Sequence, residues 1–275
     1  MFKSLLLTVL MVCSCPLLAA QLVNVGGVYF PPYVFGANEV SSRGLMPELI
    51  SALNRQQSEF HFEIVPTSLQ RRYADLNNGR VDINLFENPG WGWQEVPHQT
   101  VDMGLEDAEV FVARTAKSRT QSYFDKILGK RLALYNGYHY AIAGFNTDPD
   151  YLAQKHNAIV GYSLDGNILM VTHRRVDIAL VTRSYLKVFF KKYPAYADNL
   201  LVSRRVDQIY KHHAILRPDA PISALQFHRL LEALRQSGQL EKIFAPYDIK
   251  VESEVHLGKA AAQTAQEQPT QSQAE

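Results

Sequence analysis

The clearest pattern in the chain is a helix-like segment that runs directly into a strand-like one. Residues 68–78 place Leu69, Arg72, Tyr73 and Leu76 at the spacing of one helical face. Asn78 and Gly79, at the end of this segment, favour a helix stop. Apolar and polar side chains then alternate over residues 81–86 as in a strand. The pattern therefore predicts a short helix, a turn and a strand.

The segments on the N-terminal side repeat this alternation. Valines within residues 23–28 predict a buried strand, which Pro31 and Pro32 end. Helical spacing after Gly44 predicts a helix, and residues 60–64 alternate again. Strands that alternate with helices indicate a mostly parallel sheet covered by helices, so we expect an α/β fold.

A second set of similar elements follows in the other half of the chain. Residues 132–134 predict a short buried strand, and residues 163–173 predict a helix. The Arg-Val-Asp-Ile sequence at 175–178 then repeats that at 80–83. The repeat is too short to prove duplication, but it suggests two lobes, each with a helix, a turn and a strand directed at one shared cleft.

The order of the predicted elements also suggests how the chain is divided. The last long helix follows a strand and would otherwise lack a sheet to cover, so we expect that strand to return to the first lobe. The first lobe would then comprise residues 21–111 and 206–249, and the second lobe residues 112–205. Residues 250–275 are expected to form a disordered tail, because the composition from Gly258 onward is polar, lacks aromatic residues and cannot bury enough surface.

The first twenty residues have the pattern of an export signal. Lys3 precedes an apolar run over residues 5–18, and Ala19 and Ala20 provide small residues for cleavage before Gln21. The run is too short to span a bilayer. We therefore expect a soluble periplasmic protein that begins at Gln21.

Both cysteines of the chain lie inside this signal. Cleavage after residue 20 would remove Cys13 and Cys15, so the fold would depend on packing without any disulfide. The competing interpretation is a lipoprotein signal in which Cys15 becomes the acylated first residue. The residues around it fit that pattern poorly, since Cys13 precedes Ser14 and Pro16 follows at once.

Composition and charge narrow the possible partners. The 275 residues are 47% hydrophobic and 20% charged, which is ordinary for a globular protein. Without Lys3 the chain has 27 basic and 27 acidic residues. Basic residues that are adjacent in sequence are dispersed among acidic ones, so we expect no nucleic-acid partner. Adjacent His212 and His213 would point to opposite faces of a strand, which suits one core residue and one surface residue better than metal ligands. We expect no metal and no cofactor.

Aromatic and acidic side chains follow several predicted strands. Glu87, Trp91 and Trp93 lie in the loop after residues 81–86, Tyr33 follows the first strand, and Tyr138 follows the strand of the second half. Ligands of open α/β sheets bind at the ends of strands, which makes these residues candidates for a binding site. The alternative is a surface loop with two partly buried indoles.

Short motifs occur in a defined order along residues 22–247. They are YFPPY at 29–33, GLMPEL at 44–49, LNNGRVD at 76–82, ILGKR at 127–131, RVDIA at 175–179 and LRQSGQLEKI at 234–243. Their order and spacing resemble the periplasmic solute-binding proteins of family 3, the receptors of polar amino acid uptake systems. The resemblance implies a two-lobed periplasmic binding protein fold of type II. It also implies two crossover strands, near residues 109–114 and 201–216, that let the lobes close over a small ligand.

The departures from this family concern the residues that hold an amino acid. Family members carry an Arg on the loop after the Gly-Arg-Val-Asp strand, where it binds the ligand carboxylate, but this chain has Trp91 and Trp93 there. Members also carry an acid after the second Val-Asp strand, where this chain has Thr182 and then Arg183, which we expect to line the cleft in its place. Arg71 occupies a position at which some members place a cleft Arg. We therefore expect a small polar or aromatic-bearing solute, bound by stacking and by Arg71, rather than a simple α-amino acid.

Three functions are compatible with these features. The resemblance implies a monomeric receptor that binds a small molecule and delivers it to an ABC permease. The alternative is a periplasmic sensor subunit that signals to a membrane receptor. A third possibility is a dehydratase-like enzyme, for which Glu87 beside two indoles could be a carboxylate of raised pKa. We expect no catalysis, because no catalytic base or partner can be identified by spacing.

Overall fold

The computed structural model describes residues 19–35, 43–253 and 255. One continuous sheet runs through the molecule in the order β2-β1-β3-β8-β4-β7-β5-β6, and β9 pairs with β4. The strands are β1 (Gln21–Val28), β2 (Phe60–Thr67), β3 (Ile83–Glu87), β4 (Gln99–Arg114), β5 (Leu132–Tyr135), β6 (Ala158–Gly161), β7 (Ile178–Thr182), β8 (Leu200–Leu216) and β9 (Lys250–Val251). The α-helices are α1 (Leu45–Gln56), α2 (Arg72–Asn77), α3 (Pro149–His156), α4 (Leu164–Thr172), α5 (Arg183–Lys192), α6 (Ala224–Gln236) and α7 (Gln239–Phe244).

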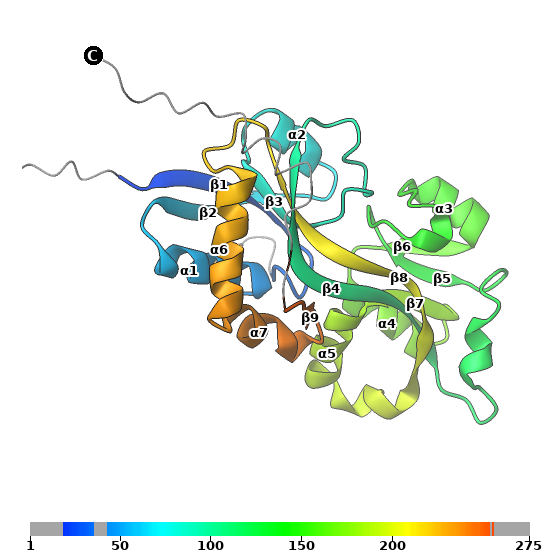
Figure 1. Cartoon of the computed structure of the whole chain (residues 1–275). Coiled ribbons are helices and arrows are strands. Elements are labelled where there is room, and N and C mark those ends of the chain that lie inside the picture. The colour runs from blue at the N-terminus through cyan, green and yellow to red at the C-terminus, as the bar shows by residue number, and fades with distance from the viewer. Residues whose placement is uncertain (1–18, 36–42, 254, 256–275) are drawn as a thin grey trace, which may run out of the picture.

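Two groups of parallel strands form the two lobes. In the first lobe β1 pairs in parallel with β2 and β3, and in the second lobe β5 pairs in parallel with β6 and β7. Figure 1 shows α1, α6 and α7 beside the first group and α3, α4 and α5 beside the second. The predicted α/β fold with two lobes, each a mostly parallel sheet flanked by helices, is confirmed.

The long antiparallel strands β4 and β8 connect the lobes (Figure 1). Both crossover strands were predicted, but β4 begins at Gln99, well before the predicted residue 109. Asp102 and Gly104 interrupt the apolar pattern there, at a bulge against β8. The predicted lobe boundaries at residues 111 and 205 fall inside these two strands, and they stay a prediction.

The aspartate of the repeated Val-Asp motif makes equivalent hydrogen bonds in both lobes. In the first lobe Asp82 accepts a hydrogen bond from the backbone N–H of Asn24 at 2.7 Å, and its own N–H donates to the Asn24 carbonyl at 2.8 Å. In the second lobe Asp177 exchanges the equivalent bonds with Arg131, at 2.8 and 2.9 Å. Each Asp thus fixes the start of one strand against the central strand of its lobe.

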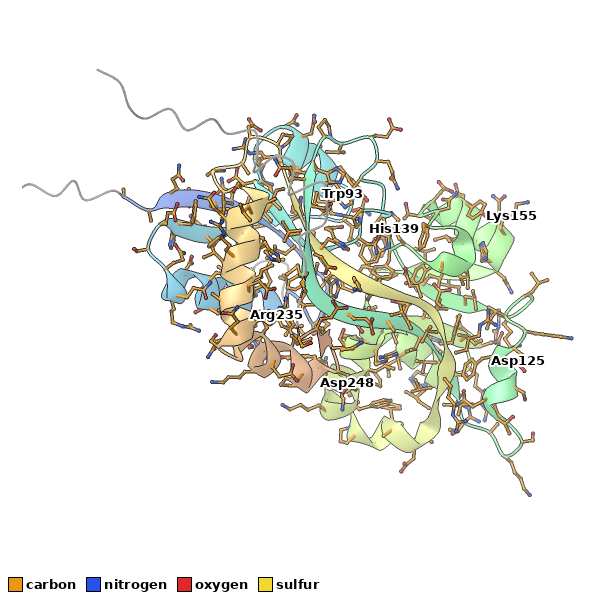
Figure 2. All side chains as sticks on the ribbon, in the orientation of Figure 1. Trp93, Asp125, His139, Lys155, Arg235 and Asp248 are labelled. Atoms are coloured by element: carbon orange, nitrogen blue, oxygen red, sulfur yellow. The ribbon has the colours of Figure 1, made fainter. Side chains whose placement is uncertain are left out.

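The end of the chain departs from the prediction of a tail from residue 250. Lys250–Val251 forms β9, which pairs with Leu105 and Glu106 of β4. Arg235 on α6, labelled in Figure 2, extends this contact, since its Nη1 donates to the Glu252 carbonyl at 2.7 Å. Near its bulge, β4 has backbone groups available to pair with a further strand, and amino-acid composition cannot predict such pairing. The predicted start of the tail at residue 250 is therefore too early.

Two sequence predictions lie outside the described residues. Most of the predicted signal, residues 1–18, and the predicted tail from 256 onward belong to this part of the chain. Among the helices that the structure describes, none has the length and apolar character needed to cross a bilayer.

Candidate functional site

A cavity of about 50 Å³ lies between the lobes, at the ends of β1 and β3. Six of its fifteen lining residues are phenylalanine, tyrosine or tryptophan. They are Phe30, Tyr33, Phe86 and Trp91 from the first lobe, Tyr138 from the second, and Tyr210 from the crossover strand β8. Arg72, Glu87, His139 and His212 also line the cavity, and the remaining lining residues are glycine or aliphatic. The site therefore lies where ligands of open α/β sheets bind, at the carboxyl ends of strands.

Side chains from the two lobes meet directly in this cavity. The rings of Phe30 and Tyr138 stack with centroids 5.0 Å apart and planes 8° from parallel. Trp91 stacks in the same way on His139, at 6.0 Å and 11°. Ligand pockets usually measure about 300–1,000 Å³, so a cavity of about 50 Å³ is largely filled by the protein's own rings. The structure therefore represents a closed arrangement of the lobes.

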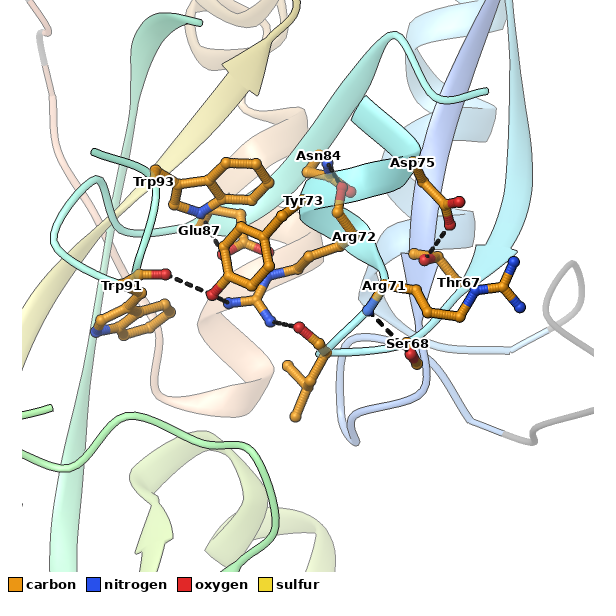
Figure 3. A network of polar contacts seen from close by, with 11 residues as sticks. Thr67, Ser68, Arg71, Arg72, Tyr73, Asp75, Asn84, Glu87, Trp91 and Trp93 are labelled. Atoms are coloured by element: carbon orange, nitrogen blue, oxygen red, sulfur yellow. Dashed lines mark hydrogen bonds and ion pairs between the residues drawn. The ribbon is translucent and has the colours of Figure 1, made fainter. Parts of the chain in front are cut away.

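A buried ion pair fixes the first-lobe side of the cavity. Arg72 Nε lies 2.8 Å from Glu87 Oε1, and the two side chains are 1% and 7% exposed. Glu87 Oε2 also accepts a hydrogen bond from Trp93 Nε1 at 3.0 Å (Figure 3). Burial raises the pKa of Glu87, while Arg72 and the Trp93 N–H oppose the shift. The carboxylate is thus held by two donors from different segments.

The same network positions the tryptophan loop. Arg72 Nη2 donates to the Tyr73 hydroxyl at 2.8 Å, and this hydroxyl donates to the Trp91 carbonyl at 2.6 Å. Arg72 Nη1 donates to the Leu69 carbonyl. All three guanidinium nitrogens of Arg72 therefore contact protein groups, and the chain from Arg72 through Tyr73 ties the Trp91 loop to α2 (Figure 3).

Arg72 occupies the place that was predicted for Arg71. The Arg71 side chain is exposed and points away from Glu87 in Figure 3. One helical residue turns the side-chain direction by about 100°, so adjacent positions face the cavity and solvent respectively. The helical spacing in the sequence already grouped Arg72 with Leu69 and Leu76, and that signal identifies the buried arginine.

Some of the other predicted site residues line the cavity and some do not. Four of them line the cavity, namely Tyr33, Glu87, Trp91 and Tyr138. Trp93 is fully buried and contacts Glu87, so it supports the site without lining the cavity. Thr182 is a buried N-cap whose side chain accepts from the Tyr185 N–H at 3.2 Å, and Arg183 is exposed. Neither of these two lines the cavity.

The crossover strands contribute a polar cluster that the sequence did not predict as part of the site. The Tyr33 hydroxyl lies 2.7 Å from His212 Nε2 and donates to Asp107 Oδ2 at 3.0 Å. Burial lowers the pKa of His212 to about 3, so its ring is neutral near pH 7. His212 is 1% exposed whereas His213 is half-buried, in agreement with the predicted opposite faces.

Carboxyl groups lie behind the rings on the same two strands. Asp107 and Glu109 on β4 are buried, and Glu109 Oε2 has no hydrogen-bond partner among the described residues. Burial raises the pKa of Glu109 well above its usual value, and the charges of Asp207 and Asp107 raise it further. Asp207 on β8 accepts hydrogen bonds from the N–H groups of Ala141 and Ile142, at 2.7 and 2.9 Å.

Comparison with known proteins decides the fold. No family model and no curated protein matches the sequence. Solved structures match over most of the chain. The fold is that of the two-lobed periplasmic binding proteins.

Three of these solved structures show the kinds of protein that share the fold. A histidine kinase sensor domain with similarity to periplasmic binding proteins is 17% identical, with a TM-score of 0.64, and the match covers 85% of this chain and 99% of that one. An ABC uptake transporter substrate-binding protein from Streptococcus pneumoniae with bound histidine is 16% identical, with a TM-score of 0.64 and coverages of 82% and 92%. The substrate-binding protein of an amino acid ABC transporter is 16% identical, with a TM-score of 0.59 and coverages of 82% and 99%.

Proposed function

We propose that the protein is an exported, periplasmic solute-binding protein whose lobes close on a small ligand and deliver it to an ABC transporter. The observation that carries this proposal is the cavity itself. Aromatic side chains from both lobes and from the crossover strand β8 converge at the strand ends of a binding-protein fold. A few polar groups within an aromatic and aliphatic wall are typical of ligand sites.

The polar groups argue against a simple α-amino acid as the ligand. A ligand carboxylate is best bound by an arginine whose charge is not already balanced by another carboxylate. Arg72 is the one Lys or Arg among the described residues of the cavity wall, and Glu87 balances its charge at 2.8 Å. The proposed ligand is therefore a polar or aromatic-bearing solute without that requirement. The same ion pair disfavours catalysis by Glu87, which is held by Arg72 and Trp93.

A sensor subunit that signals to a membrane receptor is the second candidate. It is favoured by the likeness to the histidine kinase sensor domain, whose TM-score of 0.64 equals that of the histidine-bound transporter receptor. Crosslinking in native membranes distinguishes the two roles. Recovery of a permease with its ATPase supports delivery, and recovery of a receptor supports signalling.

A thermal-shift screen over amino acids, polyamines, carboxylates, nucleosides and peptides tests ligand binding. A solute at about a hundred times its dissociation constant should stabilise the protein by about 2.7 kcal/mol. The Trp91→Ala variant should lose most of the shift relative to its own ligand-free midpoint. Arg71→Ala is the matched control and should keep the shift. A tightly bound standard amino acid, or an unchanged shift in Trp91→Ala, would contradict the proposal.

A further inference from the structure

We propose that the solute is a small organic cation, an alkylammonium compound without a carboxylate. This inference rests on the proposed solute-binding function and names the chemical class of its ligand. Three observations carry it: the charge of the cavity wall, the unpaired carboxyl group behind that wall, and the aromatic lining.

The charges of the cavity wall cancel one another. Arg72 and Glu87 form an ion pair, so the pair contributes no net charge. His139 and His212 are the other titratable nitrogens of the wall, and burial lowers the pKa of each to about 3. No described group of the wall is therefore a free cation near pH 7, and a ligand carboxylate would lack a counter-charge.

The carboxyl groups behind the wall do lack a counter-charge. The Tyr33 hydroxyl, which lines the cavity, donates to Asp107 Oδ2 at 3.0 Å, so the negative charge of Asp107 reaches the cavity through this phenol. Glu109 is 1% exposed, and its Oε2 is unpaired among the described residues. Burial raises the pKa of Glu109 most, the charges of Asp207 and Asp107 raise it further, and a side-chain hydrogen bond with Tyr138 opposes the shift. A cation in the cavity would supply the counter-charge that the ionised form of these carboxyl groups lacks.

The lining matches the same chemistry. The faces of tryptophan, tyrosine and phenylalanine rings attract alkylammonium groups, with tryptophan the strongest. Trp91 is 6% exposed, and Tyr138 and Tyr210 lie within 5.7 Å of it, measured between ring centroids. Phe30 stacks on Tyr138 from the opposite lobe. When the lobes open, these rings present faces on both sides of the cleft, as a cage for a cation requires.

Glu109 also predicts a proton linked to binding. In the closed arrangement without ligand its raised pKa favours the neutral acid. A cation nearby stabilises the carboxylate, so Glu109 loses a proton to the solvent as the cation binds. Cation affinity should consequently increase as the pH rises through the titration of Glu109, whereas a neutral solute should bind with no such dependence.

Matched pairs of solutes test the inference by isothermal titration calorimetry on the full chain. Choline is compared with its uncharged isostere 3,3-dimethylbutan-1-ol, and benzylamine with benzyl alcohol. We expect at least one cation to bind, with its neutral partner at least about tenfold weaker. Glycine betaine, which adds a carboxylate to the trimethylammonium group, should bind more weakly than choline.

Titrations in two buffers of different ionisation enthalpy measure the linked proton. The wild type should release up to one proton per bound cation, and Glu109→Gln should release none while keeping a cation preference from the rings. Arg71→Ala is the control and should match the wild type. If an uncharged or anionic solute binds and both cations fail, the inference on charge is overturned and the solute-binding function stands. If no solute of any charge binds, both are overturned.

Discussion

Arg72 is a guanidinium with a 1% exposed side chain, and its charge is balanced by Glu87 on the neighbouring strand. Removing two charges from water is expensive, and their attraction offsets that cost only while both partners are present. Single substitutions at this pair should therefore be far more damaging than the paired substitution. The exposed neighbour Arg71 has no such role.

We expect Arg72→Met to lower the free energy of unfolding by about 3–5 kcal/mol, because it leaves Glu87 buried without its counter-charge. The double variant Arg72→Met/Glu87→Gln should recover part of this loss. Arg71→Met should stay within about 0.5 kcal/mol of the wild type. Urea unfolding measures all three, and an Arg71→Met loss as large as that of Arg72→Met would contradict the assignment.

A second residue-scale prediction concerns His139 and acid. Burial first, and then the charge of Arg72, lower the pKa of His139 to about 3. The unfolded chain protonates this ring near its ordinary pKa of about 6.5, so it binds more protons than the folded chain between about pH 3 and 6.5. The neutral His139 ring contributes its full stabilisation above about pH 6.5. Below that pH the free energy of unfolding falls by up to about 1.4 kcal/mol per pH unit.

The variant His139→Gln removes this titration. Its free energy of unfolding should depend less on pH than that of the wild type between about pH 3 and 6.5, and the two slopes should agree above that window. Urea titrations at several pH values provide the comparison. Equal acid slopes for both proteins would show that His139 is protonated in the folded state.

At the scale of elements, the helix–turn–strand unit is the part of the fold that sequence predicts best. The apolar spacing of α2 and the alternation of β3 are local, and the Arg-Val-Asp-Ile repeat marks the same unit in the second lobe. The start of β4 and the existence of β9 were missed, because both depend on pairing across the sheet at the bulge near Gly104. Such pairing leaves no periodic signal in the sequence.

The two equivalent aspartates should differ in their contribution to stability. Asp82 has a 4% exposed side chain and pairs with Arg217 Nε at 2.7 Å, whereas Asp177 is 33% exposed and pairs with Arg131 at 3.2 Å. Asp82→Ala should cost about 3–5 kcal/mol, because it breaks a largely buried ion pair and a hydrogen bond to the Asn24 N–H.

Asp177→Ala provides the matched comparison. Solvent weakens the ion pair of Asp177 with Arg131, so the loss in free energy of unfolding should be smaller. We expect about 1–2 kcal/mol from the lost hydrogen bond to the Arg131 N–H, and less from the lost ion pair. Chemical denaturation of both variants gives the two values. Equal losses would mean that burial does not distinguish the two sites.

At the scale of the whole molecule, the order of motifs was enough to predict two lobes and two crossover strands. The cleft was predicted in part, since Tyr33, Glu87, Trp91 and Tyr138 line it. Tyr210 and His212 were missed because they come from β8, far along the chain, and only the register between strands brings them to the cavity.

A cavity of about 50 Å³ also has a consequence for the whole molecule. Rings from both lobes fill the space in which a solute would bind, so the solute can enter only if the lobes move apart. Binding should therefore convert open molecules into closed ones, as hinge closure does in periplasmic binding proteins.

Double electron–electron resonance between spin labels on the two lobes tests this claim most directly. The chain has no cysteine after Cys15, so a protein that begins at Gln21 can carry labels at Arg229→Cys on α6 and Lys155→Cys on α3, both exposed positions. The account predicts a population with a longer distance in the absence of solute. A saturating solute from the thermal-shift screen should replace it with a shorter distance, as the lobes close on the solute. One unchanged distance with and without that solute would contradict closure on a ligand.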